Sequence, residues 1–321
     1  MDKYQGIISA NLLEQFLDKP CNSFTRTDLI RFIEEKGIRM LNFRYVAEDG
    51  KLKTLNFVIN GRDHLESVLA TGERVDGSSL FSFIGAGSSD LYVVPRYKTA
   101  FVNPFSEVPT LDMLCSYYDS EGKPLESSPE YILRKAHKRF KSSSGFVFKA
   151  MGELEYYVQG VKEEMYPTED QRGYHASSPF SNYESLRLEA MKLISRAGGK
   201  IKYGHCEVGS FSTDAESFEQ HEIEFLPVDA EDAVDQLIIA KWILRQLGDK
   251  YGVNLSFAPK ITVGKAGSGL HVHMMLTKDG KNEMMSEKGL SDIAKKLIAG
   301  LLDLASPLPA FGNTLPTSYL R

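Results

Sequence analysis

Residues 146–160 read "FVFKAMGELEYYVQG", a run rich in aromatic and branched residues that predicts a β-strand. Side chains two positions apart share one face of a strand, so Glu153 and Glu155 point the same way. Two carboxylates on one face repel each other unless a cation lies between them. Because exposed Glu-x-Glu pairs are common, the pair indicates a cation site only if other segments supply further ligands.

Further candidate ligands follow in two segments. In "HCEVGSFSTDAESFEQHEIEF", residues 205–225, Glu207 closes one expected strand and Glu222 shares a strand face with Glu224. Glutamate is depleted from strands, so repeated acids in such segments are unusual. In "KAGSGLHVHMML", residues 265–276, His271 and His273 share a face behind a glycine-rich turn that permits close backbone approach. Together these segments predict one sheet that presents hard ligands to a common centre.

The residue types favour particular metals and exclude particular nucleotide folds. Carboxylates with a single imidazole suit Mg²⁺ or Mn²⁺ rather than structural zinc. Two such ions can clamp phosphate oxygens during phosphoryl transfer. There is no GxxxxGK[ST] motif, and the segment Gly85-Ala86-Gly87 fits no dinucleotide fingerprint. Residue chemistry alone therefore leaves two hypotheses, a two-metal phosphoryl-transfer enzyme and an α+β protein whose acidic strands are simply solvated.

Composition bounds the class of protein. A chain of 321 residues with 42% hydrophobic and 25% charged residues predicts about two ordinary globular domains. A net charge of −5 gives no basic footprint for nucleic acid and no polybasic membrane patch. Three scattered cysteines without a CxxC pair indicate a reducing compartment. With neither a signal-peptide core nor a long apolar run, we expect a cytoplasmic protein.

The chain divides by pattern into an N-terminal α+β domain, residues 1–105, and a second domain, residues 106–321. In the first, residues 25–37 predict a short helix that stops at Gly37, and Asp49-Gly50 predicts a hairpin between two strands. In the second, strands alternate with longer helices at 129–140, 184–199 and 230–252, and residues 253–263 read as a strand. In the helix at 230–252 we expect Val234, Leu237, Ile238, Leu244 and Leu247 to face inward.

In their order along the chain, these motifs resemble the glutamine synthetase family and its relatives, the glutamate–amine ligases. The resemblance runs from about residue 60 to the end. It is carried by "VDGSS", "SSDLYVVP", "VNPF", "GELEYYV", "RGYH", "HCEVG", "EQHEIEF", "FAPK", "GSGLHVH" and "PTSYLR".

The resemblance implies an α+β fold with a β-grasp-like N-terminal domain and a catalytic domain built on an antiparallel half-barrel with helices. It also implies homo-oligomeric rings in which subunits share active sites. The implied activity is ATP-dependent formation of glutamine from glutamate and ammonia, through a γ-glutamyl phosphate intermediate.

The resemblance also implies roles for individual residues. Two Mg²⁺ or Mn²⁺ ions are expected, one held by Glu155, Glu207 and Glu222, the other by Glu153, His271 and a further glutamate. Asp76 is expected to accept the ammonium proton across a subunit boundary. Expected substrate contacts are Gly267 and Arg321 with glutamate, His273 with the ATP phosphates, and Tyr174 in the substrate-side loop.

The sequence departs from the family pattern in several places. The segment between Glu207 and Glu222 is longer than usual and carries Glu219 where a glycine is commoner. Ala266 replaces the usual asparagine, and Met275 replaces a small hydroxyl residue near the nucleotide. These changes leave room for a ligase that uses a larger amine.

The chain also stops at Arg321, inside a motif that the family continues. We therefore expect a C-terminally truncated member, either as a natural truncation or as a piece of a longer reading frame. A non-catalytic fragment that serves as an assembly partner is a further hypothesis.

Overall fold

The computed structural model describes residues 9–162 and 164–321, which separate into two compact units. Unit 1 contains the described residues up to Lys135 together with Lys192–Gly199, and unit 2 contains the described residues of Ala136–Met191 and Lys200–Arg321. The division expected after residue 105 stays a prediction. The strand that follows it, β6 (Thr110–Tyr118), pairs with β1 (Met40–Val46) in the sheet of unit 1.

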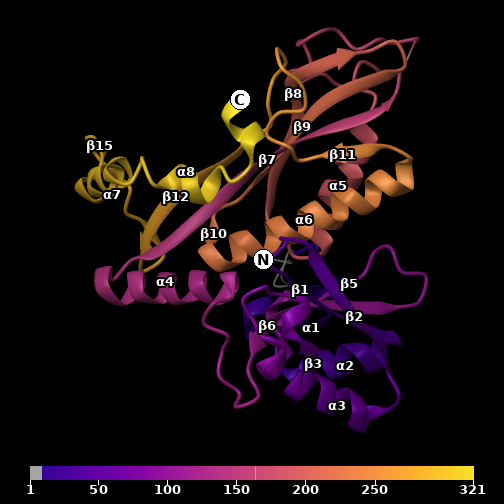
Figure 1. The fold of residues 1–321 in the computed structure, drawn as a ribbon, viewed down its shortest axis with the longest axis vertical. Helices are drawn as coiled ribbons and strands as arrows, with labels where there is room; N and C mark the ends of the chain where they lie inside the picture. Colours follow the sequence, from indigo (N-terminus) through magenta and orange to yellow (C-terminus); the bar gives the residue numbers. More distant parts are fainter. Residues whose placement is uncertain (1–8, 163) are drawn as a thin grey trace, which may run out of the picture. The chain divides into compact units, whose positions relative to one another are not determined.

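Unit 1 is built on a six-stranded sheet of order β2-β1-β6-β4-β3, with β5 on the edge of β6 (Figure 1). The remaining strands are β2 (Leu52–Val58), β3 (Glu73–Asp76), β4 (Asp90–Pro95) and β5 (Phe101–Val102). Strands β1 and β6 are parallel, and the other pairs are antiparallel. The hairpin predicted at Asp49-Gly50 joins β1 to β2, and Gly50 takes the left-handed φ of 69° that such turns require.

Among the described residues, α1 (Leu12–Leu17), α2 (Arg26–Lys36) and α3 (Arg62–Thr71) lie wholly within unit 1. The predicted helix at 25–37 is confirmed, because α2 begins with a capping box between Thr25 and Asp28 and ends at Gly37 with φ 65°. Its apolar face joins the sheet in one hydrophobic core. The fully buried Asp112 of β6 pairs with Arg44 and accepts a hydrogen bond of 2.8 Å from Asn42.

Unit 2 is built on a seven-stranded sheet of order β13-β12-β7-β9-β8, with β10 and β11 also pairing β7. Its strands are β7 (Val147–Val161), β8 (Ile201–Ser212), β9 (Glu216–Phe225), β10 (Val228–Asp229), β11 (Asn254–Ser256), β12 (Leu270–Lys278) and β13 (Lys281–Asn282). All pairs with β7 are antiparallel, and β7 lies at the centre. A small hairpin, β14 (Met285–Ser286) and β15 (Gly289–Leu290), follows.

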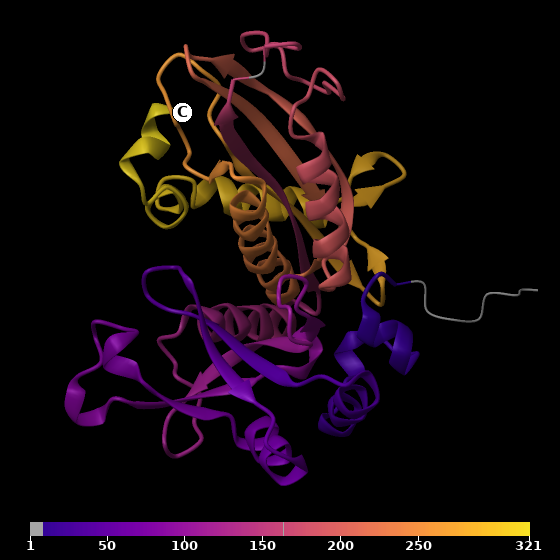
Figure 2. The ribbon, with the colours of Figure 1, turned by 90° about the vertical axis from the view of Figure 1, so that its right-hand side faces the viewer.

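Helices cover one face of this sheet (Figure 2). Leu237 of α6 (Ala230–Tyr251) lies 4.0 Å from the position that a Cβ on Gly152 of β7 would take. The sulfur of Met191 of α5 (Glu184–Arg196) lies 2.9 Å from the position that a Cβ on Gly204 of β8 would take. Because neighbouring strand residues point to opposite faces, Glu153 and His205 point away from these helices. The other helices are α4 (Pro129–Ser144), α7 (Asp292–Asp303) and α8 (Leu308–Gly312).

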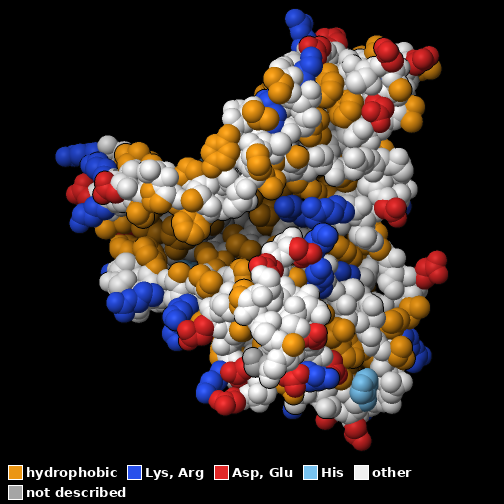
Figure 3. All heavy atoms as spheres, in the orientation of Figure 1, with side chains coloured by type: hydrophobic (Ala, Val, Ile, Leu, Met, Phe, Trp, Pro, Cys, Tyr) orange, Lys and Arg blue, Asp and Glu red, His pale blue; other side chains and the backbone are white. Residues whose placement is uncertain are grey.

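Short 3₁₀ turns complete the chain at Cys21–Ser23, Gly77–Ser79, Ala86–Ser88, Tyr97–Thr99 and Pro316–Leu320. The strand expected over residues 253–263 is wrong beyond its first part, because pairing with β7 ends at Ser256 and Pro259 lacks the N–H that a ladder needs. Hydrophobic side chains lie at the surface over the C-terminal helices (Figure 3), among them Leu302 and Phe311. Across the described residues, every helix is too short or too polar to cross a membrane.

Candidate metal and substrate site

The open face of the unit 2 sheet gathers the acidic and histidine side chains that the sequence singled out. Strand register sets their positions: Glu153 lies opposite both His271 and Glu224, and Glu155 lies opposite Glu222. We call this surface the acidic face, and define it by the following residues on β7, β8, β9 and β12: Glu153, Glu155, His205, Glu207, Glu222, Glu224, His271 and His273. One sheet therefore brings together the ligands expected from three separate sequence segments.

Glu153 receives both histidines. The Nδ1 atom of His271 lies 2.7 Å from one carboxylate oxygen of Glu153, and the Nε2 atom of His273 lies 2.6 Å from the other. Burial works to raise the pKa of Glu153, but the hydrogen bonds from His271 and His273 outweigh it and hold the pKa below its usual range. The structure thus places His271 beside Glu153 as expected. It also places His273, expected on the nucleotide phosphates, on the same carboxylate.

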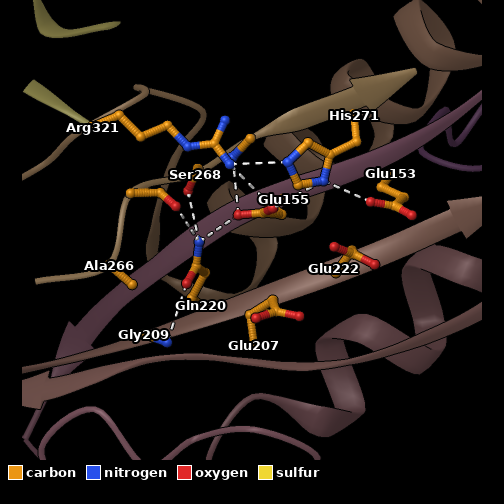
Figure 4. Close-up of polar contacts among 12 residues, drawn as sticks. Glu153, Glu155, Glu207, Gly209, Gln220, Glu222, Ala266, Ser268, His271 and Arg321 are labelled. Atoms are coloured by element: carbon orange, nitrogen blue, oxygen red, sulfur yellow. Dashed lines mark hydrogen bonds and ion pairs between the residues drawn. The ribbon is translucent and has the colours of Figure 1, made fainter. Parts of the chain in front are cut away.

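Glu155 is buried and held from one side only. Its Oε2 atom accepts hydrogen bonds of 2.8 Å from the side chain of Gln220 and 2.9 Å from the backbone N–H of Gly269. Its Oε1 atom faces Arg321 at 3.7 Å and His271 at 3.9 Å (Figure 4). One oxygen is therefore fixed by N–H donors, and the other is directed toward the acidic face.

Glu222 lies at the centre of the acidic face. Its carboxylate belongs to two groups whose ligand atoms lie within 4.8 Å of one another, one with His205 and Glu207, the other with Glu153 and Glu224. Burial, followed by the charges of Glu153, Glu207, Glu155 and Glu224, raises the pKa of Glu222 to about 7. Burial and the neighbouring carboxylates thus both disfavour the charged form of Glu222.

His205 completes this part of the face. Its Nδ1 atom lies 3.0 Å from the carbonyl oxygen of Cys206, and a carbonyl only accepts, so Nδ1 carries the proton. The Nε2 atom lies 3.4 Å from Glu222, and Nδ1 lies 3.8 Å from Glu207. Glu224 differs from its neighbours because Lys202 pairs with it at 2.7 Å. His205 is therefore better placed than Glu224 to serve as an additional ligand.

The donors on the acidic face fit a hard divalent cation. Carboxylate oxygens with a few imidazole nitrogens are the set that Mg²⁺ and Mn²⁺ accept. The raised pKa of Glu222 agrees with this fit, because burial and then the neighbouring carboxylates disfavour its charge, and a cation among them would offset both. The residues present therefore fit the expected ions.

The glycine-rich turn before β12 lies against Arg321. A Cβ on Gly267 would lie 2.5 Å from the carbonyl oxygen of Pro259, and one on Gly269 would lie 2.3 Å from an Arg321 guanidinium nitrogen. At Gly267 the backbone of Pro259 leaves no room for a side chain, whereas at Gly269 the Arg321 side chain would have to move. The Nη2 atom of Arg321 also lies 3.2 Å from Nε2 of His271. Gly267, Arg321 and the acidic face are thus brought together.

Tyr174 lies on an exposed loop that runs along the edge of β8. Backbone N–H groups of Gln171, Gly173 and His175 donate to carbonyl oxygens of β8 at 2.6, 3.3 and 2.9 Å. The ring of Tyr174 stacks on His175 at 4.1 Å and meets His205 edge-on at 5.6 Å. The loop therefore brings Tyr174 to the border of the acidic face through His205.

Asp76 belongs to unit 1, at the end of β3. Its carboxylate accepts hydrogen bonds of 2.7 Å from the Ser78 hydroxyl, 2.8 Å from the Ser79 hydroxyl and 3.0 Å from the Ser78 N–H. These bonds lower the pKa of Asp76 to about 2, so it is ionised at neutral pH. An exposed, fixed carboxylate of this kind can receive a cationic group from another molecule.

The unusual Glu219 points to the opposite face of β9. It accepts hydrogen bonds of 2.8 Å from the Asn182 N–H and 3.1 Å from the Ser181 hydroxyl, and lies 3.3 Å from His221. Cys206 joins Glu219 and His221 in a buried cluster, but the guanidinium of Arg187 lies 3.0 Å from its sulfur. A fixed positive charge at that position disfavours a bound cation. The cluster instead serves as a packing contact, because its members come from β8, β9 and α5.

Sequence reasoning missed His205, which lies on the acidic face, and Gln220, which bonds Glu155 of that face. The signal was present in the alternation, because His205 shares parity with Glu207 and Gln220 shares parity with Glu222. The roles were not readable from sequence, since they depend on which strands are neighbours.

Comparison with known proteins identifies related sequences and folds. The protein-family model described as "Glutamine synthetase, catalytic domain" matches residues 126–321, and "Glutamine synthetase, beta-Grasp domain" matches residues 37–120. The chain is 30% identical over 306 residues to a glutamine synthetase of Clostridium saccharobutylicum, covering 93% of this chain and 66% of that protein. It is 28% identical over 309 residues to one of Thermus thermophilus, covering 93% and 67%.

Solved structures show the same fold. The glutamine synthetase of Plasmodium falciparum, determined by cryo-electron microscopy, matches with a TM-score of 0.80 and 20% identity over 93% of this chain and 63% of that one. GmaS without ligand matches with a TM-score of 0.77 and 17% identity over 91% and 68%. This chain spans about two thirds of the length of the curated relatives that it matches.

Proposed function

Because the chain belongs to the glutamine synthetase family, we propose that it takes part in ATP-dependent amide formation on glutamate. The proposed reaction joins glutamate and ammonia. The γ-carboxylate of glutamate attacks the terminal phosphoryl group of ATP, and ADP leaves. The nitrogen of ammonia then attacks the carbonyl carbon of the γ-glutamyl phosphate, phosphate leaves, and the nitrogen loses a proton to give the amide. The observation that carries the proposal is the acidic face, where Glu155 lies opposite Glu222, Glu153 lies opposite His271, and Arg321 contacts His271.

The chain's own residues suit the binding roles that this reaction needs. Glu155, Glu207 and Glu222 would hold one Mg²⁺ or Mn²⁺ ion, and Glu153 with His271 would contribute to a second. Such ions neutralise phosphate oxygens during phosphoryl transfer. His273 bonds the Glu153 carboxylate, where it would compete with a metal ion. To bind an ATP phosphate, His273 would have to leave Glu153.

Substrate binding is assigned to the turn, to Arg321, to Tyr174 and to Asp76. A guanidinium pairs well with a carboxylate, which suits Arg321 to glutamate, and Gly267 brings backbone beside it. Tyr174 would line the substrate side of the face. Asp76, ionised at neutral pH, would accept the ammonium proton in a site completed by another subunit. This last role requires a homo-oligomer, and we propose one, in the cytoplasm, without nucleic acid or membrane partners.

The domain division proposed after residue 105 assigns Asp76 to the N-terminal domain and all proposed metal ligands to the catalytic domain. The proposal includes a second candidate for the amine. Ala266 stands at the turn with a small side chain, and its carbonyl accepts a hydrogen bond of 2.8 Å from Tyr157. Because Ala266 replaces the asparagine that is usual in the family, a larger amine is the second candidate substrate, in place of ammonia.

Phosphate release tests the proposal. The purified chain is given ATP, L-glutamate, Mg²⁺ or Mn²⁺ and, in turn, ammonium and a panel of primary amines. We expect glutamate-dependent phosphate release that Glu155→Ala abolishes. The matched control is Glu216→Ala, which removes a carboxylate from the same strand as Glu222 but six residues away, where it bonds Gln159 at 2.9 Å.

Two outcomes contradict parts of the proposal. No release with any amine, together with Mn²⁺ binding that Glu155→Ala leaves unchanged, contradicts a ligase and favours a non-catalytic assembly partner. Release with a larger amine but not with ammonium replaces the first substrate by the second candidate.

A further inference from the structure

Gln220 lies beneath the acidic face with its carboxamide fully engaged. It stands on β9 two residues before Glu222, lies opposite Tyr157 of β7, and is 2% exposed. Its Nε2 atom donates to Oε2 of Glu155 at 2.8 Å and to the carbonyl oxygen of Gly267 at 3.1 Å, with the hydroxyl of Ser268 at 3.3 Å (Figure 4). Its Oε1 atom accepts from the backbone N–H of Gly209 at 3.1 Å.

The surroundings allow only one orientation of this amide. If oxygen and nitrogen exchanged places, the oxygen would face the carboxylate of Glu155 and the carbonyl of Gly267, while the NH₂ group would face the N–H of Gly209. Each contact would then join two acceptors or two donors. The NH₂ group therefore bonds Glu155 and the turn, and the oxygen anchors the side chain to β8.

One side chain thus connects a proposed metal ligand to the proposed substrate turn. Gln220 and the N–H of Gly269 together fix Oε2 of Glu155, which leaves Oε1 directed at the acidic face. The same NH₂ group fixes the carbonyl of Gly267, one residue from Ser268. A movement of the carboxylate toward a cation and a movement of the turn toward a ligand therefore act on the same amide.

We propose that Gln220 is a positioning residue that sets the orientation of Glu155 for a divalent cation and couples cation binding to the Gly267–Gly269 turn. This inference rests on the proposed function, since it assigns the cation to Glu155 and the substrate to the turn. Hydrogen bonds to a carboxylate are charge-assisted, and loss of a partner that orients a metal ligand typically costs about 10–100-fold in metal affinity.

The experiment compares Gln220→Met with Gln236→Met. Both replace a buried glutamine by an apolar side chain of similar length, and both remove a side-chain oxygen that accepts a backbone N–H, that of Gly209 in one case and that of Lys200 at 3.0 Å in the other. Gln236 lies on α6, on the helix-covered side of the sheet. It therefore controls for the general cost of removing a buried amide.

The measured quantities are the Kd of Mn²⁺, with and without saturating L-glutamate, and the Tm without metal. We expect Gln220→Met to raise the Kd of Mn²⁺ about 10–100-fold and to abolish any change that glutamate makes in that Kd. We expect Gln236→Met to change the Kd by less than about twofold, even if its Tm falls as far as the Tm of Gln220→Met. Gln220→Asn, which keeps the amide but is too short to span from Gly209 to Glu155, should behave like Gln220→Met.

The outcomes separate this inference from the proposed function. If Glu155→Ala weakens Mn²⁺ binding but Gln220→Met raises the Kd of Mn²⁺ no more than Gln236→Met does, the inference is wrong and the metal site stands. If Glu155→Ala also leaves Mn²⁺ binding unchanged, the proposed function fails with it. A wild-type Kd that glutamate does not alter overturns the coupling, and should Gln220→Met fail to fold, Gln220→Asn decides the positioning role.

Discussion

Replacing Glu222 by glutamine should stabilise the protein without metal and destabilise it with metal. Glu222 is 6% exposed, and burial, followed by the charges of four other carboxylates, raises its pKa from 4.5 to about 7. Glu222→Gln keeps the shape of the side chain and removes its charge. The variant therefore relieves the repulsion on the acidic face, and it also removes a ligand that the proposed cation needs.

The size of the effect follows from the pKa shift. A shift of this size has an upper limit of about 3 kcal/mol, and water on the open face reduces it to roughly 1–2 kcal/mol. The unfolded chain loses this proton near pH 4.5 and the folded chain near pH 7. Between these values the folded state holds more protons, so the free energy of unfolding falls as pH rises. The gain from Glu222→Gln should therefore be complete above pH 7 and small at pH 5.

Thermal unfolding followed by circular dichroism measures both halves of the prediction. In EDTA at pH 8 the Tm of Glu222→Gln should exceed that of the wild type by about 2–8 °C, and the difference should shrink at pH 5. Mn²⁺ at a hundred times its Kd should stabilise the wild type by about 2.7 kcal/mol and the variant far less, which reverses the order. The reasoning is refuted if Mn²⁺ raises both Tm values equally, or if the wild type is the more stable protein in EDTA at pH 8.

Three further predictions concern other parts of the structure. Gly267→Ala places a Cβ 2.5 Å from the carbonyl oxygen of Pro259. It should therefore lower the free energy of unfolding in urea by about 1–3 kcal/mol and abolish glutamate-dependent phosphate release. Unchanged stability would contradict the close approach. Asp112→Asn removes the charge of the buried carboxylate that pairs with Arg44, so it should lower the free energy of unfolding in urea by about 3–5 kcal/mol while the Kd of Mn²⁺ stays unchanged. The Mn²⁺ affinity should fall about tenfold per pH unit below pH 7, because the cation displaces the proton of Glu222, and calorimetry in two buffers should detect about one released proton.

Local signals were sufficient to predict much of the fold. The capping pattern at Thr25 and the stop at Gly37 depend on neighbouring residues alone, and both are confirmed. Alternation correctly placed Glu153 and Glu155 on one face, and it did the same for His271 and His273. The order of motifs added the family and the β-grasp and catalytic architecture, which the comparisons confirm.

Features that depend on tertiary neighbours were not predictable in the same way. In α6 the expected inward residues Leu244 and Leu247 are fully buried, but Val234 is 41% exposed and the polar Gln236 is buried instead. A 3.6-residue period fixes the width of an apolar stripe but not its exact rotation, and Gln236 is buried because a backbone N–H bonds it. Gln220 is the same case, since its partners come from three separate segments.

The loop that carries Tyr174 has a consequence for association between molecules. By donating three backbone hydrogen bonds to β8, it occupies carbonyl groups that would otherwise form an open sheet edge. An open edge is a template onto which another chain adds a strand. The loop therefore protects the sheet from edge-to-edge aggregation while it presents Tyr174 beside His205.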